Sequence, residues 1–318
     1  MLLKKRNTPE HFPGPAHPTR DTICVMAAEA GTSAADEAAV VAKRRRRVGP
    51  FPLYQRERRP PVWWQELAFI GVSYTLYGAI RNHFGKPEPV RCAADALTDF
   101  QRIACDRAYD ILHVERVLNI DVELPLNRIA AHHEWIAVPM NYFYALAHFI
   151  VTIGVLVWLY RRHPLQYRPM RTALYVANVI ALGGYWLYSL APPRFMPDEG
   201  YVDTLKVFGT WGSYASGDLA RASNQFAAMP SMHIGWALWA GLAIFWLNRR
   251  SWLRWLGIVY PIVTLVVIMA TANHFILDAV GGAVALAAGF GAQRLLSGEP
   301  AVDPEATQPP LTSLPSPA

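Results

Sequence analysis

Four ionisable side chains stand at the mouths of apolar segments, where such groups are costly and usually functional. They are Arg194, His233, His274 and Asp278. His274 and Asp278 are four residues apart, so on a helix they share a face and their side chains can meet. A carboxylate bonded to one imidazole nitrogen fixes the tautomer and makes the other nitrogen more basic. The spacing therefore predicts His274 as a nucleophile and Asp278 as the group that orients it.

The residues near this pair suit a phosphate group. His233, in a different apolar segment, is predicted to protonate a leaving alkoxide as a general acid. Pro230 suits a helix start, and Ser231 offers a hydroxyl and an N–H to phosphate oxygens there. Arg194 carries the planar guanidinium that binds phosphate well. Both histidines are expected at helix N-termini, whose N–H groups and dipole also favour phosphate, so the pattern predicts transfer of a phosphoryl-type group.

Each of these residues also has a plain structural interpretation. A histidine in a membrane can bond a neighbouring carbonyl, and Arg194 can act as an interfacial anchor. His132, His133 and Glu134 suggest a metal or acid–base cluster, but they stand where an apolar segment meets water and are interpreted as interfacial anchors. Four glycines of the last apolar segment are predicted to allow close helix packing without a catalytic role: Gly281, Gly282, Gly289 and Gly291.

Six apolar segments must position these residues. Of the 318 residues, 53% are hydrophobic and only 17% are charged, whereas a soluble domain is about a quarter charged. Each segment is long enough, or nearly so, to cross a bilayer core of about 30 Å. They are Trp63–Ile80, Ile136–Tyr160, Thr172–Leu190, Met232–Leu247, Leu253–Thr271 and Phe275–Leu296.

The predicted fold class is all-α, a six-span transmembrane helical bundle over residues 61–297. A basic tail over residues 1–60 and a Pro-rich tail over residues 298–318 are expected to be disordered. The N-terminal tail lacks the apolar core of a cleavable signal peptide, and Met26 is an alternative start.

The distribution of basic residues predicts the orientation of the bundle. They gather before span one, between spans two and three and between spans four and five, as Lys43–Arg47, Arg161, Arg162, Arg168, Arg171, Arg249, Arg250 and Arg254. An even number of crossings separates these regions, so all fall on one side, which the positive-inside rule makes cytoplasmic. We therefore expect a multi-pass plasma-membrane protein with both termini cytoplasmic and the four candidate residues at the outer face. The Lys43–Arg47 cluster is interpreted as lipid-facing, and no nucleic-acid partner is expected.

The first outer loop contains a further helical pattern. Apolar residues recur there at helical spacing, as Leu97, Phe100, Ala104, Ala108, Ile111 and Leu118. This pattern predicts an extracytoplasmic amphipathic helix that lies in the membrane interface or caps the bundle. Cys92 and Cys105 are assigned to the same helix. Thirteen helical positions would separate them by about 20 Å, too far for a disulfide, so free thiols are expected.

These motifs resemble the type 2 phosphatidic-acid phosphatase superfamily, and within it the inositol phosphorylceramide synthase branch. The resemblance covers about residues 63–296 and rests on P-S-x-H at Pro230–His233, H-x-x-x-D at His274–Asp278, the corner Pro192–Arg194 and the stretch that begins at Asn224. It implies a phosphohistidine mechanism without a metal or other cofactor. His274 would attack phosphorus of a lipid phosphate or phospholipid, and an acceptor would then take the group. Water as acceptor gives a phosphatase, and inositol or another polyol gives a transferase.

Two departures favour the transferase. The phosphatase branch has a lysine seven residues before the arginine and a Ser-Arg pair before the nucleophile, but Leu187 and Val267-Ile268 stand at these positions. A lipid phosphate phosphatase remains the first alternative. Two others stay open: a zinc-like ion held by His233, His274 and Asp278, and a non-catalytic lipid-binding or transport protein that kept the bundle.

Overall fold

The computed structural model describes residues 61–83, 91–94, 97–210, 225–249, 251–298 and 300–302. All of them belong to one compact unit, residues 49–318. The predicted tail over residues 1–60, with the Lys43–Arg47 cluster and Met26, lies outside the described residues, as do residues 303–318 of the C-terminal tail. Ala301, near the start of that tail, is buried against the helices.

The described part of the chain is helical, and no strand is found in it. Its α-helices are α2 (Trp63–His83), α3 (Asp99–Val117), α4 (Glu123–His132), α5 (Glu134–Arg162), α6 (Pro164–Leu187), α7 (Thr204–Val207), α9 (Met232–Leu247), α10 (Leu256–Ala270) and α11 (Ile276–Ser297). Short 3-10 turns are η1 (Pro193–Phe195), η2 (Pro197–Glu199) and η3 (Trp252–Trp255). The all-α class is therefore confirmed.

Each of the six predicted spans corresponds to a helix, but they differ in apolarity. Within the described residues, three stretches are long and apolar enough to cross a membrane: α5, the continuous run Trp252–Ala270, and α11. Helix α9 is apolar but has 16 residues, a rise of only about 24 Å. Helices α2 and α6 do not reach the same apolarity. The crossing of the membrane by all six stays a prediction.

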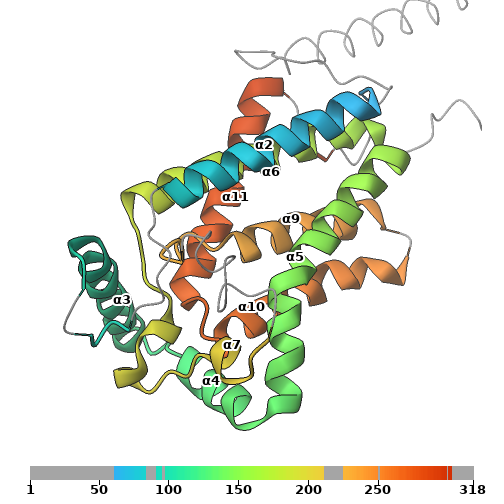
Figure 1. Ribbon diagram of the computed structural model, residues 1–318. Coiled ribbons are helices and arrows are strands. Elements are labelled where there is room, and N and C mark those ends of the chain that lie inside the picture. The colour runs from blue at the N-terminus through green and yellow to red at the C-terminus, as the bar shows by residue number, and fades with distance from the viewer. Residues whose placement is uncertain are drawn as a thin grey trace, which may run out of the picture. The chain divides into compact units, whose positions relative to one another are not determined.

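Helix α6 begins earlier than predicted. Pro164 occupies the first turn, a position that proline favours because its missing N–H is not needed there. Arg171 therefore lies inside α6 and not in a loop, where it forms an ion pair with Glu66 of α2. The Tyr167 hydroxyl donates to the same Glu66 carboxylate at 2.9 Å. These contacts fasten α2 to α6, which lie against each other in Figure 1.

Four apolar clusters of buried residues hold the described helices, and two of them are larger than the others. One joins α5, α6, α9 and α11 around the fully buried Trp239, whose indole N–H donates to the Met170 carbonyl at 2.8 Å. The other lies at the start of α11 and joins α3 to the segment after α6 through Leu112, Phe226 and Phe275. Figure 1 shows α3, α4 and α7 at this end of the bundle. The start of α11 is thus packed against the second core through Phe275 and against a smaller cluster through Ala279.

Large apolar side chains also cover the outside of the helices. Exposed examples on α2, α5, α10 and α11 are Leu67, Val72, Ile150, Ile153, Val157, Val259, Ile262, Val280 and Val284. A soluble monomer rarely exposes so much contiguous apolar surface. This surface suits contact with lipid tails.

Cys92 and Cys105 form a disulfide, so the expectation of free thiols is wrong. Helix α3 begins only at Asp99, because the Thr98 hydroxyl caps it by accepting from the Gln101 N–H at 3.3 Å. Cys92 precedes the helix, and the chain folds back so that the two Cα atoms are 5.4 Å apart. The Cys92 N–H donates to the Phe195 carbonyl at 2.7 Å, which holds the folded-back segment in place.

The disulfide gives a count of reactive thiols that can be checked. The chain has three cysteines, so alkylation of the denatured, unreduced protein is expected to label Cys24 alone. Reduction before alkylation should label all three, and intact-mass measurement distinguishes the two results. A Cys24→Ala variant serves as the control and should take up no label until it is reduced. Labelling of three thiols without reduction would contradict the disulfide.

Candidate functional site

The starts of helices α9 and α11 touch, and this contact creates the site. The Ser231 N–H, at the N-cap of α9, donates to the Asp278 carbonyl at 2.9 Å. Gly282 lies at the crossing, where an added Cβ would overlap the Ser231 carbonyl oxygen. Because the two helix starts are so close, the rings of His233 and His274 lie with their centroids 5.4 Å apart.

His274 and Asp278 meet, although not as two residues of one helix. Helix α11 begins at Ile276 with Phe275 as its N-cap, so His274 precedes the helix. The Asp278 carboxylate reaches back over the helix start. Its Oδ2 accepts from the Phe275 N–H at 3.0 Å and lies 3.3 Å from His274 Nδ1. The contact predicted from the four-residue spacing is thus made by a carboxylate that also caps the helix.

This arrangement leaves the second nitrogen of His274 available. With the Nδ1–H donating to Asp278, the lone pair of the neutral imidazole is on Nε2. That atom is buried and has no hydrogen-bond partner among the described residues. His274 is 4% exposed and Asp278 is fully buried. An imidazole with a carboxylate behind it and an unpaired nitrogen in front has the arrangement of an activated nucleophile.

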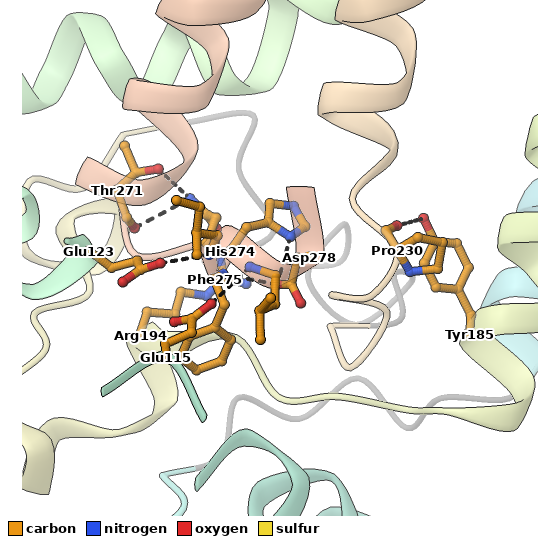
Figure 2. Close-up of polar contacts among 12 residues, drawn as sticks. Glu115, Glu123, Tyr185, Arg194, Pro230, Thr271, His274, Phe275 and Asp278 are labelled. Carbon is orange, nitrogen blue, oxygen red and sulfur yellow. Dashed lines mark hydrogen bonds and ion pairs between the residues drawn. The ribbon is translucent and has the colours of Figure 1, made fainter. Parts of the chain in front are cut away.

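Arg194 lies beside His274 and is held by neutral groups. Its guanidinium donates to Asn273 Oδ1 and, at 3.4 Å, to Gln225 Oε1 (Arg194 and His274 are both labelled in Figure 2). Arg194 is only 8% exposed. No acidic side chain in the described ranges forms an ion pair with its guanidinium. A buried, uncompensated positive charge is costly, and a bound anion would remove that cost.

A tight turn between α10 and α11 carries these residues. Ala272 adopts φ 53, a left-handed conformation that is strained for a residue with a Cβ. The Arg194 N–H donates to the Ala272 carbonyl at 2.9 Å. The Asn273 side-chain amide donates to Thr271 Oγ1 at 2.8 Å. These bonds hold the strained turn and fix both Asn273 and His274.

A cavity opens in front of the two imidazoles. Its empty volume is about 750 Å³, counting its open mouth, and Arg194, His233 and His274 all contribute to its wall. Tyr144 and His148 of α5 line it as well. The Tyr144 ring stacks on His233 with centroids 4.2 Å apart, and the His148 ring lies edge-on to His233 at 4.4 Å. The cavity thus brings Arg194, His233 and His274 together with two side chains of α5.

His148 is a cavity residue that the sequence analysis missed. The signal was present, because an ionisable side chain in the middle of an apolar span is by default a functional candidate. Its Nδ1 lies 3.0 Å from the Tyr144 carbonyl, four residues earlier on α5. A carbonyl only accepts, so Nδ1 carries the hydrogen in the neutral ring. That tautomer gives His148 a basic Nε2.

Ser231 does not match its predicted role as a donor of an N–H to phosphate. Its N–H is bonded to the Asp278 carbonyl, and Ser231 is not among the residues that line the cavity. Its hydroxyl is buried and without a hydrogen-bond partner in the described part of the chain.

His132 and His133 are exposed and contact backbone carbonyls four residues earlier, away from the cavity.

Metal binding and glycine packing give two further results. Within the described ranges, no group of three or more His, Cys, Asp or Glu side chains is arranged to hold a metal ion. Gly281, Gly282 and Gly289 lie at close helix contacts, as predicted, since an added Cβ would meet neighbouring atoms within 3.4 Å. Gly291 has nothing within 4 Å of an added Cβ, so its assignment to a packing contact is wrong.

Comparison with known proteins identifies the family. A family model described as the PAP2 superfamily matches residues 109–292, more than half of the chain. The chain therefore belongs to the PAP2 superfamily, whose members are generally phosphatases that act on phosphorylated lipids. Membership of this superfamily and the three long apolar helical stretches among the described residues together indicate a membrane protein. Searches of curated proteins and of solved structures found no match. The family match does not reach the inositol phosphorylceramide synthase branch.

The crossing at Gly282 gives a prediction about activity. In Gly282→Ala the new Cβ overlaps the Ser231 carbonyl oxygen, so α9 and α11 must separate and His233 moves away from His274. A displacement of about 1 Å can cost about 100-fold in rate. We expect turnover of a lipid phosphate to fall at least about tenfold in this variant, with a lower melting temperature.

Gly291→Ala is the matched control on the same helix. Its Cβ meets open space, and replacing a helical glycine adds up to about 1 kcal/mol of stability. Turnover by this control should therefore be retained. Full activity in Gly282→Ala would show that the crossing does not set the distance between the imidazoles.

Proposed function

We propose that the chain is an integral-membrane lipid phosphotransferase of the inositolphosphotransferase type, which works through a phosphohistidine intermediate. One observation carries the proposal: His274 Nε2 is buried, unpaired within the described residues and next to a cavity, while Asp278 occupies the opposite nitrogen. The proposal is supported by the position of His233, whose ring centroid lies 5.4 Å from that of His274, and by Arg194, which lines the same cavity.

The first half of the reaction forms the intermediate. The lone pair of His274 Nε2 attacks phosphorus, and the bond from phosphorus to the leaving lipid oxygen breaks. His233 in its protonated form gives its proton to that oxygen. Asp278 stabilises the positive charge that develops on His274, and Arg194 donates to the non-bridging phosphate oxygens. The products are a free lipid alcohol and a His274 that carries the phosphoryl group, together with the second ester group on phosphorus when the donor is a diester.

The second half returns the enzyme to its starting state. An acceptor hydroxyl gives its proton to His233, now neutral, and its oxygen attacks the phosphorus. The bond from phosphorus to His274 Nε2 breaks, and the electron pair returns to the imidazole. From a phosphodiester donor, the phosphorus keeps its second ester group throughout, so transfer to inositol or another polyol gives a new phosphodiester and transfer to water gives a phosphomonoester. From a monoester donor, transfer to water releases inorganic phosphate.

The charge of the cavity favours a diester donor. Arg194 is the one lysine or arginine among the described residues that line it. Leu187, where the phosphatase branch has lysine, is 68% exposed and lies outside the cavity wall, and Ile268 is buried without charge. A phosphodiester carries one negative charge whereas a monoester carries up to two. Because His233 gives up its proton during the first step, Arg194 is the only fixed positive charge among the described lining residues, and one fixed charge matches the diester better. The family's general activity keeps the lipid phosphate phosphatase as the alternative.

The disulfide supports the proposed orientation in the membrane. Disulfides persist in oxidising compartments outside the cytoplasm, and Cys92–Cys105 lies in the loop assigned to the outer face. The six-span arrangement, with cytoplasmic termini and α3 as an interfacial or capping helix, would place the cavity at that face. Substrates would then reach it from the outer leaflet.

Substitution of the two imidazoles separates their proposed roles. His274→Ala removes the nucleophile and His233→Ala removes the acid, so each is expected to lower turnover of a natural lipid by at least about 100-fold. With a lipid analogue whose leaving group is nitrophenolate, no proton is needed for departure. His233→Ala should then still accumulate acid-labile phosphohistidine, whereas His274→Ala should form none.

His113→Ala is the control for these variants, because His113 is exposed on α3 and outside the cavity. It should match the wild type in turnover and labelling. Phosphohistidine in the His274→Ala variant would overturn the assignment of the nucleophile.

Product analysis decides between transferase and phosphatase. The purified protein is incubated with a labelled lipid phosphomonoester or phosphodiester, with and without inositol and with and without a strong chelator. We expect label to move from the diester to inositol, regardless of the chelator. Release of inorganic phosphate from the monoester alone would favour the phosphatase. Loss of activity on chelation would favour the zinc alternative, and lipid binding without any product would favour the non-catalytic alternative.

A further inference from the structure

Two buried carboxyl groups from outside the helix cap the start of α11. Glu123 Oε1, from α4, accepts from the Ile276 N–H at 2.6 Å. Glu115 Oε1, from α3, accepts from the Leu277 N–H at 2.8 Å. The first N–H groups of a helix have no partner within the helix, so such contacts stabilise its start. Figure 2 shows both carboxyl groups directed at the segment that carries His274.

The remaining oxygen of each carboxyl group, Oε2, indicates that the two groups share a proton. Glu115 Oε2 and Glu123 Oε2 are both buried, and no donor among the described residues faces them. The two carboxyl groups lie within hydrogen-bond contact of each other. Burial, followed by the charge of Glu123, raises the pKa of Glu115 to about 8. Burial also raises the pKa of Glu123. Two adjoining buried carboxyl groups do not both ionise readily, so near neutral pH the pair keeps one proton, which can bridge the two oxygens.

No lysine or arginine among the described residues neutralises the charge of the carboxyl pair. Among the described residues, no lysine or arginine forms an ion pair with Glu115 or Glu123. The titratable groups that face them are Asp278 of α11, whose charge disfavours ionisation of both, and the buried Tyr201. Arg116, the nearest basic residue on α3, is paired with Glu199 at 2.6 Å and lies near Asp121.

We propose that Glu115 and Glu123 are positioning residues, a proton-sharing carboxyl pair that fixes the start of α11 and thereby holds the His274–Asp278 pair in its reactive arrangement. The proposal rests on the proposed role of His274. Ile276 and Leu277 follow His274 by two and three residues, and Asp278 comes next. A shift of these two N–H groups would therefore move both members of the catalytic pair.

The shared proton makes the arrangement sensitive to alkaline pH. The pKa of Glu115 in the folded protein, about 8, lies above its ordinary value of 4.5. A raised folded pKa means that the stabilising contribution is complete below 4.5, declines as the pH rises and is lost above about 8. Once the proton leaves, two carboxylates and Asp278 repel one another in a buried site. We expect the start of α11 to loosen and activity to fall above about pH 8.

Glu115→Gln tests this proposal. The amide keeps an oxygen acceptor for the Leu277 N–H and offers an N–H to Glu123, so it imitates the protonated carboxyl at every pH. The ratio of turnover at pH 9 to turnover at pH 7 should rise at least about threefold over the wild type. The melting temperature of the substrate-free protein should also change less between pH 7 and pH 9. Glu134→Gln, at an exposed position on α5, is the matched control and should keep the wild-type profiles.

The two measurements separate this proposal from the proposed function. Melting temperatures need no substrate, so they report on the carboxyl pair even if the chain proves not to be a phosphotransferase. An unchanged pH dependence of melting in Glu115→Gln would overturn the shared proton. A changed melting profile with an unchanged turnover ratio would overturn the link to His274. Glu115→Ala, which leaves the Leu277 N–H unpaired, should lose turnover at both pH values, and normal turnover in it would also overturn that link.

Discussion

The hydrogen bond from the Ser231 N–H to the Asp278 carbonyl is the contact on which the site depends. It joins the first residues of α9 and α11, and it forms only because Gly282 has no side chain at the crossing. Each helix start carries one imidazole, so this single contact sets the distance between His233 and His274. The apolar cores on either side keep the contact in place because interiors this well packed do not deform gradually. The geometry of the site is therefore a property of helix packing.

Three groups near this crossing are in states that lower the stability of the folded protein unless other contacts compensate. His274 Nε2 is buried without a partner in the described part of the chain, Arg194 is buried without a counter-charge there, and Ala272 is in a strained conformation. Such features persist when the surrounding structure holds them, and they concentrate at functional sites. A phosphate bound in the cavity would give Arg194 its counter-charge and would place phosphorus in front of the His274 Nε2 lone pair. The strained Ala272 is held by two hydrogen bonds of the turn. Its carbonyl accepts from the Arg194 N–H, and the neighbouring Asn273 side-chain amide donates to the Thr271 carbonyl.

The family gives the site a general chemistry, and the cavity suggests how this chain uses it. Membership of the PAP2 superfamily is shown by the match over residues 109–292, and it covers both motif histidines. The choice of donor and acceptor depends on residues outside the motifs. Arg194 supplies the one fixed positive charge among the described residues that line the cavity, beside three imidazoles. This balance of charge is the physical basis for proposing a phosphodiester donor.

The sequence by itself determined the helical class, the approximate helix positions and the proximity of His274 to Asp278. These features are local, because apolar runs express the geometry of one helix and the His274–Asp278 contact lies within a single helix start. Only the tertiary structure decided that Cys92 joins Cys105, and that Glu115 and Glu123 cap a helix 162 and 153 residues further along the chain. Contacts of this kind depend on where the chain folds back, and no periodicity within one segment specifies the partner in another.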